Sequence, residues 1–164
     1  MSSPDGLVAL DADLAAIIVE WVHSAEELAV IAGPTLHWPL TVDQLMGPIS
    51  GVERFAAVLL DAGRPVAFGT LRRYQDSVRL GWILVDPQRR GAGWGRRLME
   101  QLIREADRRH GPRRLTLGVY THNLPALKLY RSLGFSEQPP VPIDFEGYPW
   151  QKIEMELIAI DEAR

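Results

Sequence analysis

The chain has 164 residues, of which 46% are hydrophobic and none is cysteine, so it can form one domain with one core but no disulfide, thiolate metal site or cysteine nucleophile. Its formal net charge is −3 at pH 7, and a chain that is not basic overall gives no indication of nucleic-acid binding. Its cationic side chains are nearly all arginine, which favours fixed, bidentate contacts. The four histidines show no metal-ligand spacing, and no apolar run approaches ~20 residues, so we expect a cytoplasmic protein without a membrane segment or a metal.

The first third of the chain predicts one strand followed by three short helices. Leu7–Leu10 is a short apolar run typical of a strand, and Asp11 or Asp13 can cap the helix that follows it. Ser24–Glu27 and Thr41–Gln44 have the spacing of capping boxes, so each predicts a further short helix. The inward face of the first helix is expected to comprise Leu14, Ile17, Ile18, Trp21 and Val22.

The middle of the chain predicts an antiparallel meander. Its three strand-like runs, Phe55–Leu60, Pro65–Tyr74 and Ser77–Val85, are separated by segments with turn chemistry. The third run ends at Asp86–Pro87, because proline removes a backbone donor. A strongly periodic helix follows, from about Trp94 to His110, and its outer face has acidic and basic side chains at i,i+4. These pairs are Glu100 with Arg104 and Glu105 with Arg109.

The C-terminal part predicts a strand, a helix and a final strand. Leu115–Tyr120 is the first of these, and the order strand, helix, strand requires a crossover, so part of the sheet should be parallel. Asn123 is a good N-cap, Pro125 sits in the first turn and Gly134 is a C′ glycine, which together predict a helix of about three turns. A proline-broken segment then leads to the final strand, Trp150–Ile158.

A glycine-rich turn joins the third strand of the meander to its helix. Gly91, Gly93 and Gly95 let the backbone turn tightly and point several N–H groups one way, and the helix adds the positive end of its dipole. Such a corner binds an anion, most simply a phosphate. A P-loop is excluded because neither lysine, Lys128 or Lys152, follows such a glycine run. A dinucleotide-binding fingerprint is disfavoured because the next strand lacks a carboxylate.

The turn fits a third kind of phosphate-binding site. Gln88–Gly93, placed shortly after a Val-x-Pro sequence, resembles the pyrophosphate-binding motif of the GNAT superfamily of acetyl-CoA-dependent N-acetyltransferases. A second motif of the same family follows it in the expected order, and the two together are far more specific than either alone. The resemblance covers the C-terminal two-thirds of the chain. The second motif, Asn-x-x-Ala-x-x-Leu-Tyr-x-x-x-Gly-Phe, is matched by Asn123, Ala126, Leu129, Tyr130, Gly134 and Phe135.

The resemblance implies an α/β (α+β) fold with a mixed, mostly antiparallel central sheet that splays after the fourth strand and is flanked by helices. It implies a single N-acetyltransferase domain over residues 1–164. The expected reaction is direct transfer of acetyl from acetyl-CoA, as cosubstrate, to a primary amine of a small molecule or peptide. The expected partners are therefore a CoA thioester and an amine, with no nucleic acid and no membrane, and a homodimer is left open.

The resemblance also assigns residues to the CoA thioester. The strand end at Ile83, Leu84 and Val85 would bind the pantetheine arm as a further strand would, and the amides of the glycine-rich turn would hold the pyrophosphate. Arg89, Arg96 or Arg97 could reach the 3′-phosphate of the CoA thioester. For each of them, a position on a solvent-exposed face with no role in binding is an equal alternative. The full set is Ile83, Leu84, Val85, Arg90, Gly91, Ala92, Gly93, Trp94, Gly95, Arg96, Asn123 and Tyr130.

Tyr130 falls where the family usually places the general acid that protonates the leaving thiolate. The alternative is a purely structural role, in which Tyr130 packs inward with Leu127 and Leu133. Four aromatic or titratable side chains are candidates to line the acceptor site: His37, Trp38, Trp82 and Tyr148.

The general base is left open, because the strands on which relatives often place a glutamate contain no carboxylate here. The remaining candidates are Glu53, Asp76, His37, His122 and Glu146, or an ordered water chain. This missing base suggests an alternative function, a non-catalytic acyl-CoA-binding or regulatory module. A weaker alternative is an enzyme that uses a longer acyl group.

Overall fold

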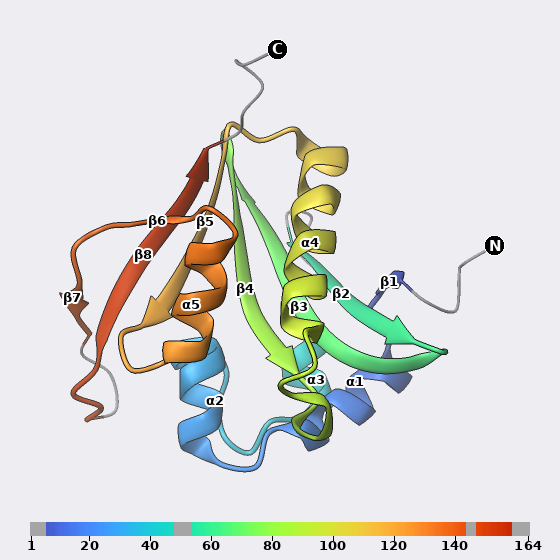
Figure 1. Cartoon of the computed structure of the whole chain (residues 1–164). Helices are drawn as coiled ribbons and strands as arrows, with labels where there is room; N and C mark the ends of the chain where they lie inside the picture. Colours follow the sequence, from blue (N-terminus) through green and yellow to red (C-terminus); the bar gives the residue numbers. More distant parts are fainter. Residues whose placement is uncertain (1–5, 48–53, 144–146, 159–164) are drawn as a thin grey trace.

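The computed structural model of the chain describes residues 6–47, 54–143 and 147–158 (Figure 1). The helices are α1 Ala12–Ile18, α2 Ala25–Ala32, α3 Val42–Met46, α4 Trp94–His110 and α5 Leu124–Ser132, with 3-10 turns η1 Val19–Trp21, η2 Gly33–Thr35 and η4 Pro87–Arg89. The strands are β1 Gly6–Ala9, β2 Arg54–Asp61, β3 Arg64–Tyr74, β4 Ser77–Val85, β5 Arg114–Tyr120, β6 Ser136–Glu137, β7 Val141–Pro142 and β8 Gln151–Ile158. None of the helices in these ranges is both long and apolar enough to cross a membrane.

All the described strands belong to one sheet, in the order β1-β2-β3-β4-β5-β8-β6, with β7 also paired to β8. Every neighbouring pair is antiparallel except β4 and β5, which are parallel, as the crossover through α4 requires. The helices flank this sheet on both faces (Figure 1). The predicted fold class, with its mixed and mostly antiparallel sheet, is confirmed.

The sheet opens between β4 and β5. These strands pair only where Ser77–Arg79 faces Arg114–Thr116, and beyond that point they separate, as Figure 1 shows. A bulge bends β4 inside the opening: the pairing of β3 with β4 slips by one residue around Trp82, whose φ of 51° is unusual for a bulky side chain. The bulge and the missing partner leave the β5-facing edge of Leu80–Val85 without strand hydrogen bonds.

Two cores lie on opposite faces of the sheet, because successive strand side chains point to opposite sides. Ala57 on β2 packs with α4 and α5, whereas its neighbour Ala56 packs with α1, α2 and α3. The α4/α5 core includes Leu71, Leu80, Leu98, Met99, Leu102, Leu117, Leu127 and Tyr130. The α1–α3 core includes Ala15, Ile18, Leu28, Leu45, Val58, Phe68, Trp82 and Leu84.

Two predicted details of the helices are wrong. Ile17, expected on the inward face of α1, is 45% exposed, because Ala15 and Ile18 set a narrow inward stripe and the helix tightens into a 3-10 turn after Ile18. Glu100 on α4 pairs with Arg96, at 3.4 Å, and not with the residue four positions later. The other expected pair on α4, Arg109 with Glu105 at 2.6 Å, is present.

Candidate functional site

The glycine-rich turn begins where β4 ends. The N–H of Asp86 still donates to the carbonyl of Val66 on β3 at 2.9 Å, so the sheet continues up to the proline. The carboxylate of Asp86 then accepts from the N–H of Gln88 at 3.0 Å and starts the turn η4. Gly91 and Gly93 follow with φ of 80° and 86°, a left-handed conformation that glycine adopts without strain. The turn thereby reverses the chain into α4.

The N-terminus of α4 is open. Its N-cap is Gly93, which has no side chain, so no side chain caps the helix by accepting from its first N–H groups. A Cβ placed on Gly91 or Gly93 would meet nothing within 4 Å, so the backbone there faces free space. Gly95 has another role: a Cβ there would lie 3.5 Å from Leu129 and 3.7 Å from Val85, so this position sets how closely α4 packs on α5 and β4. Open N–H groups at the start of a 17-residue helix suit an anion.

Three arginines near this turn contact other side chains of the same chain. Arg89 pairs with Asp61 at 3.1 Å, and Arg97 lies over the ring of Trp94 at 4.9 Å. Arg96 donates to the hydroxyl of Ser132 at 2.5 Å and so links α4 to α5. Arg96 and Arg97 are therefore on the outer surface beside the turn, held by contacts with the two helices.

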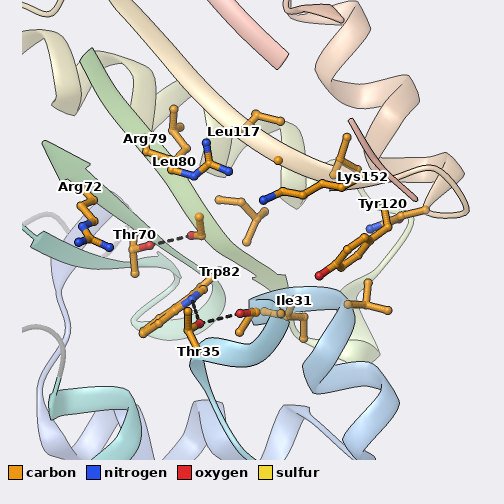
Figure 2. A pocket seen from close by; sticks show the side chains of 18 of the residues that line it. Ile31, Thr35, Thr70, Arg72, Arg79, Leu80, Trp82, Leu117, Tyr120 and Lys152 are labelled. Atoms are coloured by element: carbon orange, nitrogen blue, oxygen red, sulfur yellow. Dashed lines mark hydrogen bonds between the residues drawn. The ribbon is translucent and has the colours of Figure 1, made fainter. Parts of the chain in front are cut away.

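A cavity of about 260 Å³ lies in the opening between β4 and β5 (Figure 2). The end of α2 and η2 close one side of it, and residues of β2, β3, β4, β5, β8 and α5 form the rest. Of the residues predicted for the site, it brings together Trp82, Ile83, Asn123 and Tyr130. The cavity thus connects the open edge of β4 to the N-terminus of α5.

Tyr130 is a buried titratable group of this site, as is Tyr120. Tyr130 is 6% exposed, its ring lies 6.3 Å from that of Phe135, and it lines the cavity. Burial raises the pKa of the phenol to about 12, so the hydroxyl is protonated at neutral pH. Asn123, whose side chain accepts from the N–H of Ala126 at 3.4 Å, caps the helix on which Tyr130 stands.

Of the four residues predicted for the acceptor site, Trp82 lines the cavity and the others do not. Trp82 is 7% exposed, and its indole N–H donates to the hydroxyl of Thr35 at 3.2 Å, as Figure 2 shows. His37 and Trp38 lie in the loop after η2, where Trp38 is 45% exposed. Tyr148 stacks on Trp150, with ring centroids 4.2 Å apart.

None of the candidate general bases within the described residues lines the cavity. Asp76 lies in the turn between β3 and β4, where those strands are paired, and its carbonyl accepts from the N–H of Arg113. His122 packs between aromatic rings, 4.6 Å from Trp150. Glu53 and Glu146 lie outside the described residues.

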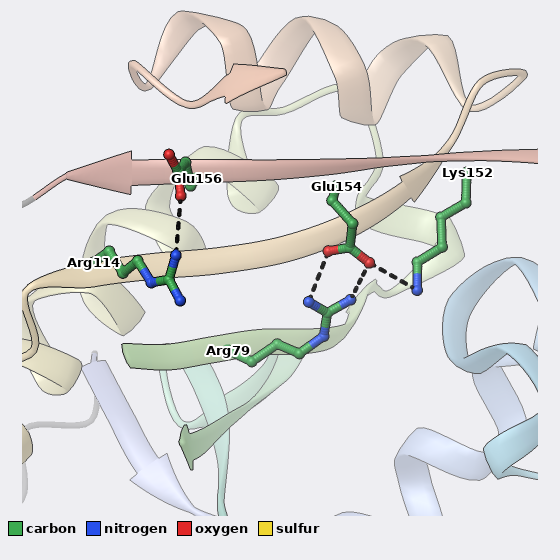
Figure 3. Close-up of polar contacts among 5 residues, drawn as sticks. All are labelled: Arg79, Arg114, Lys152, Glu154 and Glu156. Atoms are coloured by element: carbon green, nitrogen blue, oxygen red, sulfur yellow. Dashed lines mark hydrogen bonds and ion pairs between the residues drawn. The ribbon is translucent and has the colours of Figure 1, made fainter. Parts of the chain in front are cut away.

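Sequence reasoning missed the polar lining of the cavity. Arg79 on β4 and Lys152 on β8 both reach Glu154, which accepts two hydrogen bonds from Arg79 at 2.8 and 3.0 Å and forms an ion pair with Lys152 at 3.1 Å (Figure 3). The pKa of Glu154 is lowered, because its hydrogen bonds and the cationic neighbours outweigh the opposing effect of burial. Strand alternation could have grouped the cavity residues on one face, but no local pattern shows which strands lie side by side. The missed lining residues are Arg54, Thr70, Arg72, Tyr74, Arg79, Tyr120 and Lys152.

Comparison with known proteins places these features in a family. The sequence profile of the acetyltransferase (GNAT) family matches residues 21–135. The [ribosomal protein bS18]-alanine N-acetyltransferase of Escherichia coli K12 is 40% identical over 79 residues, which are 48% of this chain and 53% of that protein. The L-methionine sulfoximine/L-methionine sulfone acetyltransferase of Salmonella typhimurium is 32% identical over 83 residues, 49% of this chain and 47% of that protein. The matches thus span about half the length of these curated relatives.

Solved structures agree over nearly the whole chain. The Escherichia coli ribosomal-protein-S18-alanine N-acetyltransferase has a TM-score of 0.72 at 26% identity, covering 94% of this chain and 93% of that one. The Vibrio cholerae spermidine N-acetyltransferase, solved with CoA and spermine, has a TM-score of 0.78 at 18% identity, covers 96% of each chain and supports the fold alone. Since the profile covers more than half of the chain and includes both predicted motifs, the chain belongs to the acetyltransferase (GNAT) family.

Proposed function

We propose that this protein transfers the acetyl group of acetyl-CoA to a primary amine, by direct attack of the amine nitrogen on the thioester carbonyl. The observation that carries the proposal is the presence of three features: an open strand edge on β4, an uncapped glycine-rich helix start directly after that strand, and a protonated tyrosine buried in the cavity beside the open edge. The names of the related enzymes support it, since they act on alanine of a ribosomal protein or on methionine sulfoximine and methionine sulfone.

In this proposal the donor is held by backbone groups. The N–H groups from Arg90 to Arg96 bind the pyrophosphate, and the helix dipole adds ~0.3 to 1 kcal/mol. The free edge of Ile83–Val85 takes the pantetheine arm in place of a fifth strand, and an N–H near Ile83 receives the acetyl carbonyl. Asn123 anchors the arm near the start of α5. Glycine at 91 and 93 leaves room for the phosphates, since nothing occupies the space that a Cβ would take.

The chemistry moves one proton from nitrogen to sulfur. The C–N bond forms, the C–S bond breaks, the amine loses a proton and the leaving thiolate gains one. A phenol with a pKa of about 12 transfers its proton to a thiolate, whose conjugate acid has a pKa of ~8.5, only at a cost of about 5 kcal/mol. Tyr130 therefore acts first as a hydrogen-bond donor to the charge that develops on sulfur, and it gives its proton to sulfur only as its oxygen receives the proton that nitrogen releases.

Deprotonation of the amine needs no carboxylate in the cavity. Among the described residues that line it there are four cations and no aspartate, glutamate or histidine. Nearby positive charges disfavour an ammonium group, so they lower the pKa of a bound amine and raise the fraction that is neutral and nucleophilic. The cavity thus performs part of the task of a general base.

Calorimetric titration with acetyl-CoA, followed by thiol release on a panel of amines, tests the proposal. We expect acetyl-CoA to bind and at least one primary amine to release CoA and gain an acetyl group, seen by mass spectrometry. Binding without turnover on any amine would support a non-catalytic acyl-CoA-binding module instead. No binding of acetyl-CoA would contradict both functions.

A further inference from the structure

The cavity is strongly cationic in a chain whose formal net charge is −3. Arg54, Arg72, Arg79 and Lys152 line it, and no described lining residue carries a negative charge. Glu154, which lies beside the cavity, neutralises one of these four charges through its contacts with Arg79 and Lys152 (Figure 3). A surplus of positive charge therefore remains in the space where the acceptor would bind.

The surplus is concentrated on two arginines of neighbouring strands. In the register of β2 and β3, Arg54 lies directly opposite Arg72, and like charges in this position destabilise a sheet. Neither side chain forms an ion pair within the described part of the chain. Burial and the charge of Arg72 lower the pKa of Arg54. The pair thus carries an unfavourable interaction that a bound anion would relieve.

Aromatic rings hold both guanidinium groups in place. Arg54 lies over the ring of Trp82 at 4.6 Å, and Arg72 lies over the ring of Tyr74 at 4.8 Å. Trp82 is itself fixed by its hydrogen bond to Thr35, and it sits in the bulge of β4 next to Ile83. The two arginines are therefore oriented on the acceptor side of the point where the acetyl group would lie. Oriented, weakly hydrated guanidinium groups suit a planar carboxylate.

We propose that the acceptor amine belongs to a small molecule that also bears a carboxylate, such as an amino acid, and that Arg54 and Arg72 bind this carboxylate. This inference rests on the proposed acetyl transfer and names the substrate class of the same site. The cavity volume of about 260 Å³ lies below the ~300 to 1,000 Å³ of pockets for drug-sized ligands, so it suits a small acceptor. A polyamine, which has several positive charges and no negative one, would meet like charges on the walls of the cavity.

The test compares acceptor amines that have a carboxylate with acceptor amines that lack one. Thiol release is measured with the 20 standard L-amino acids, the primary amides of those that react, spermidine, and alanine-initiated peptides with and without acidic side chains. We expect kcat/KM for the reacting amino acids to exceed that for their amides by about 10- to 100-fold, as for loss of a charge-assisted contact. Peptides that react only when they carry acidic side chains would place the carboxylate on a peptide. Spermidine or amides that react as well as amino acids would overturn the proposal.

The proposed role of the arginine pair is tested with Arg72→Gln, because Arg72 is exposed at the cavity wall and its replacement removes no core packing. We expect KM for the amino acid to rise about 10-fold or more, with KM for its amide unchanged, so that the preference for the carboxylate disappears. The matched control is Arg73→Gln on the same strand, whose side chain does not line the cavity. An equal loss for acid and amide would contradict the assignment.

A binding measurement keeps this inference separate from the proposed function. The CoA complex is titrated with N-acetyl amino acids and with their amides, which needs no turnover. We expect the acids to bind and the amides to bind at least about 10-fold more weakly, with the difference abolished by Arg72→Gln. Equal binding of acids and amides would overturn the carboxylate site even if acetyl transfer occurs. Failure of acetyl-CoA to bind at all would instead contradict the proposed function.

Discussion

The donor side and the acceptor side of the proposed site are built in different ways. On the donor side, the glycine-rich turn and the start of α4 are contiguous in the sequence, and in the proposed function their backbone groups bind acetyl-CoA. On the acceptor side, Arg54, Arg79 and Lys152 come from three strands that are far apart in the chain, and their side chains define the site. The donor site therefore depends on local backbone conformation, whereas the acceptor site depends on which strands pair.

Tyr130 lines the cavity and in the proposed mechanism contacts the leaving sulfur, so its variant should have the largest effect. Tyr130→Phe keeps the ring and its packing against Phe135 but removes the hydroxyl. We expect kcat to fall about 10²-fold or more while acetyl-CoA affinity and thermal stability stay the same. Steady-state kinetics and calorimetric titration check this. A turnover equal to that of the wild type would remove Tyr130 from the mechanism.

The donor side is tested by Gly93→Ala. Gly93 has φ of 86°, where alanine is strained by about 1 to 2 kcal/mol, so the variant should shift the turn and weaken acetyl-CoA binding about 10-fold. The matched control is Gly63→Ala in the turn between β2 and β3, which has φ of 78° and equally free space around its Cβ. Both variants should lose similar stability, and only Gly93→Ala should raise the Kd for acetyl-CoA. Equal affinities in the two variants would mean that the turn does not hold the donor.

The two sides also differ in how well the sequence predicts them. The sequence predicts α4 with the bounds that the structure has, because Gly93 and Gly111 flank the helix and its apolar period is regular. It does not predict the cationic wall, because alternation along β8 puts Lys152 and Glu154 on one face without showing that this face meets Arg79. For His37, Trp38 and Tyr148 the prediction rests on side-chain chemistry alone, and the structure puts them outside the cavity lining.

The acceptor side is tested by Gly118→Ala. A Cβ on Gly118 would lie 2.3 Å from Cε of Lys152 and 2.8 Å from Nη2 of Arg79, so these flexible ends must move while the sheet can stay intact. We expect KM for the acceptor to rise about 5-fold, with the Kd for acetyl-CoA unchanged. Gly47→Ala is the control, since it has φ of −58° and nothing within 4 Å of its Cβ. A changed donor affinity in Gly118→Ala would show that the two sides are not independent.

The smallest expected effect concerns the exclusion of water from the phenol of Tyr130. The folded-state pKa of Tyr130, about 12, is above its ordinary value of 10, so ionisation favours the unfolded chain. The stability that this tyrosine contributes is complete below pH 10 and is lost as the pH rises through 12. At pH 11 the loss is about 1 kcal/mol relative to pH 9. Urea unfolding of the wild type should therefore show a steeper fall in free energy between pH 9 and pH 11 than that of Tyr130→Phe, which has no group to ionise there. Parallel curves would mean that water reaches the phenol, and in that case the leaving thiolate would take its proton from solvent.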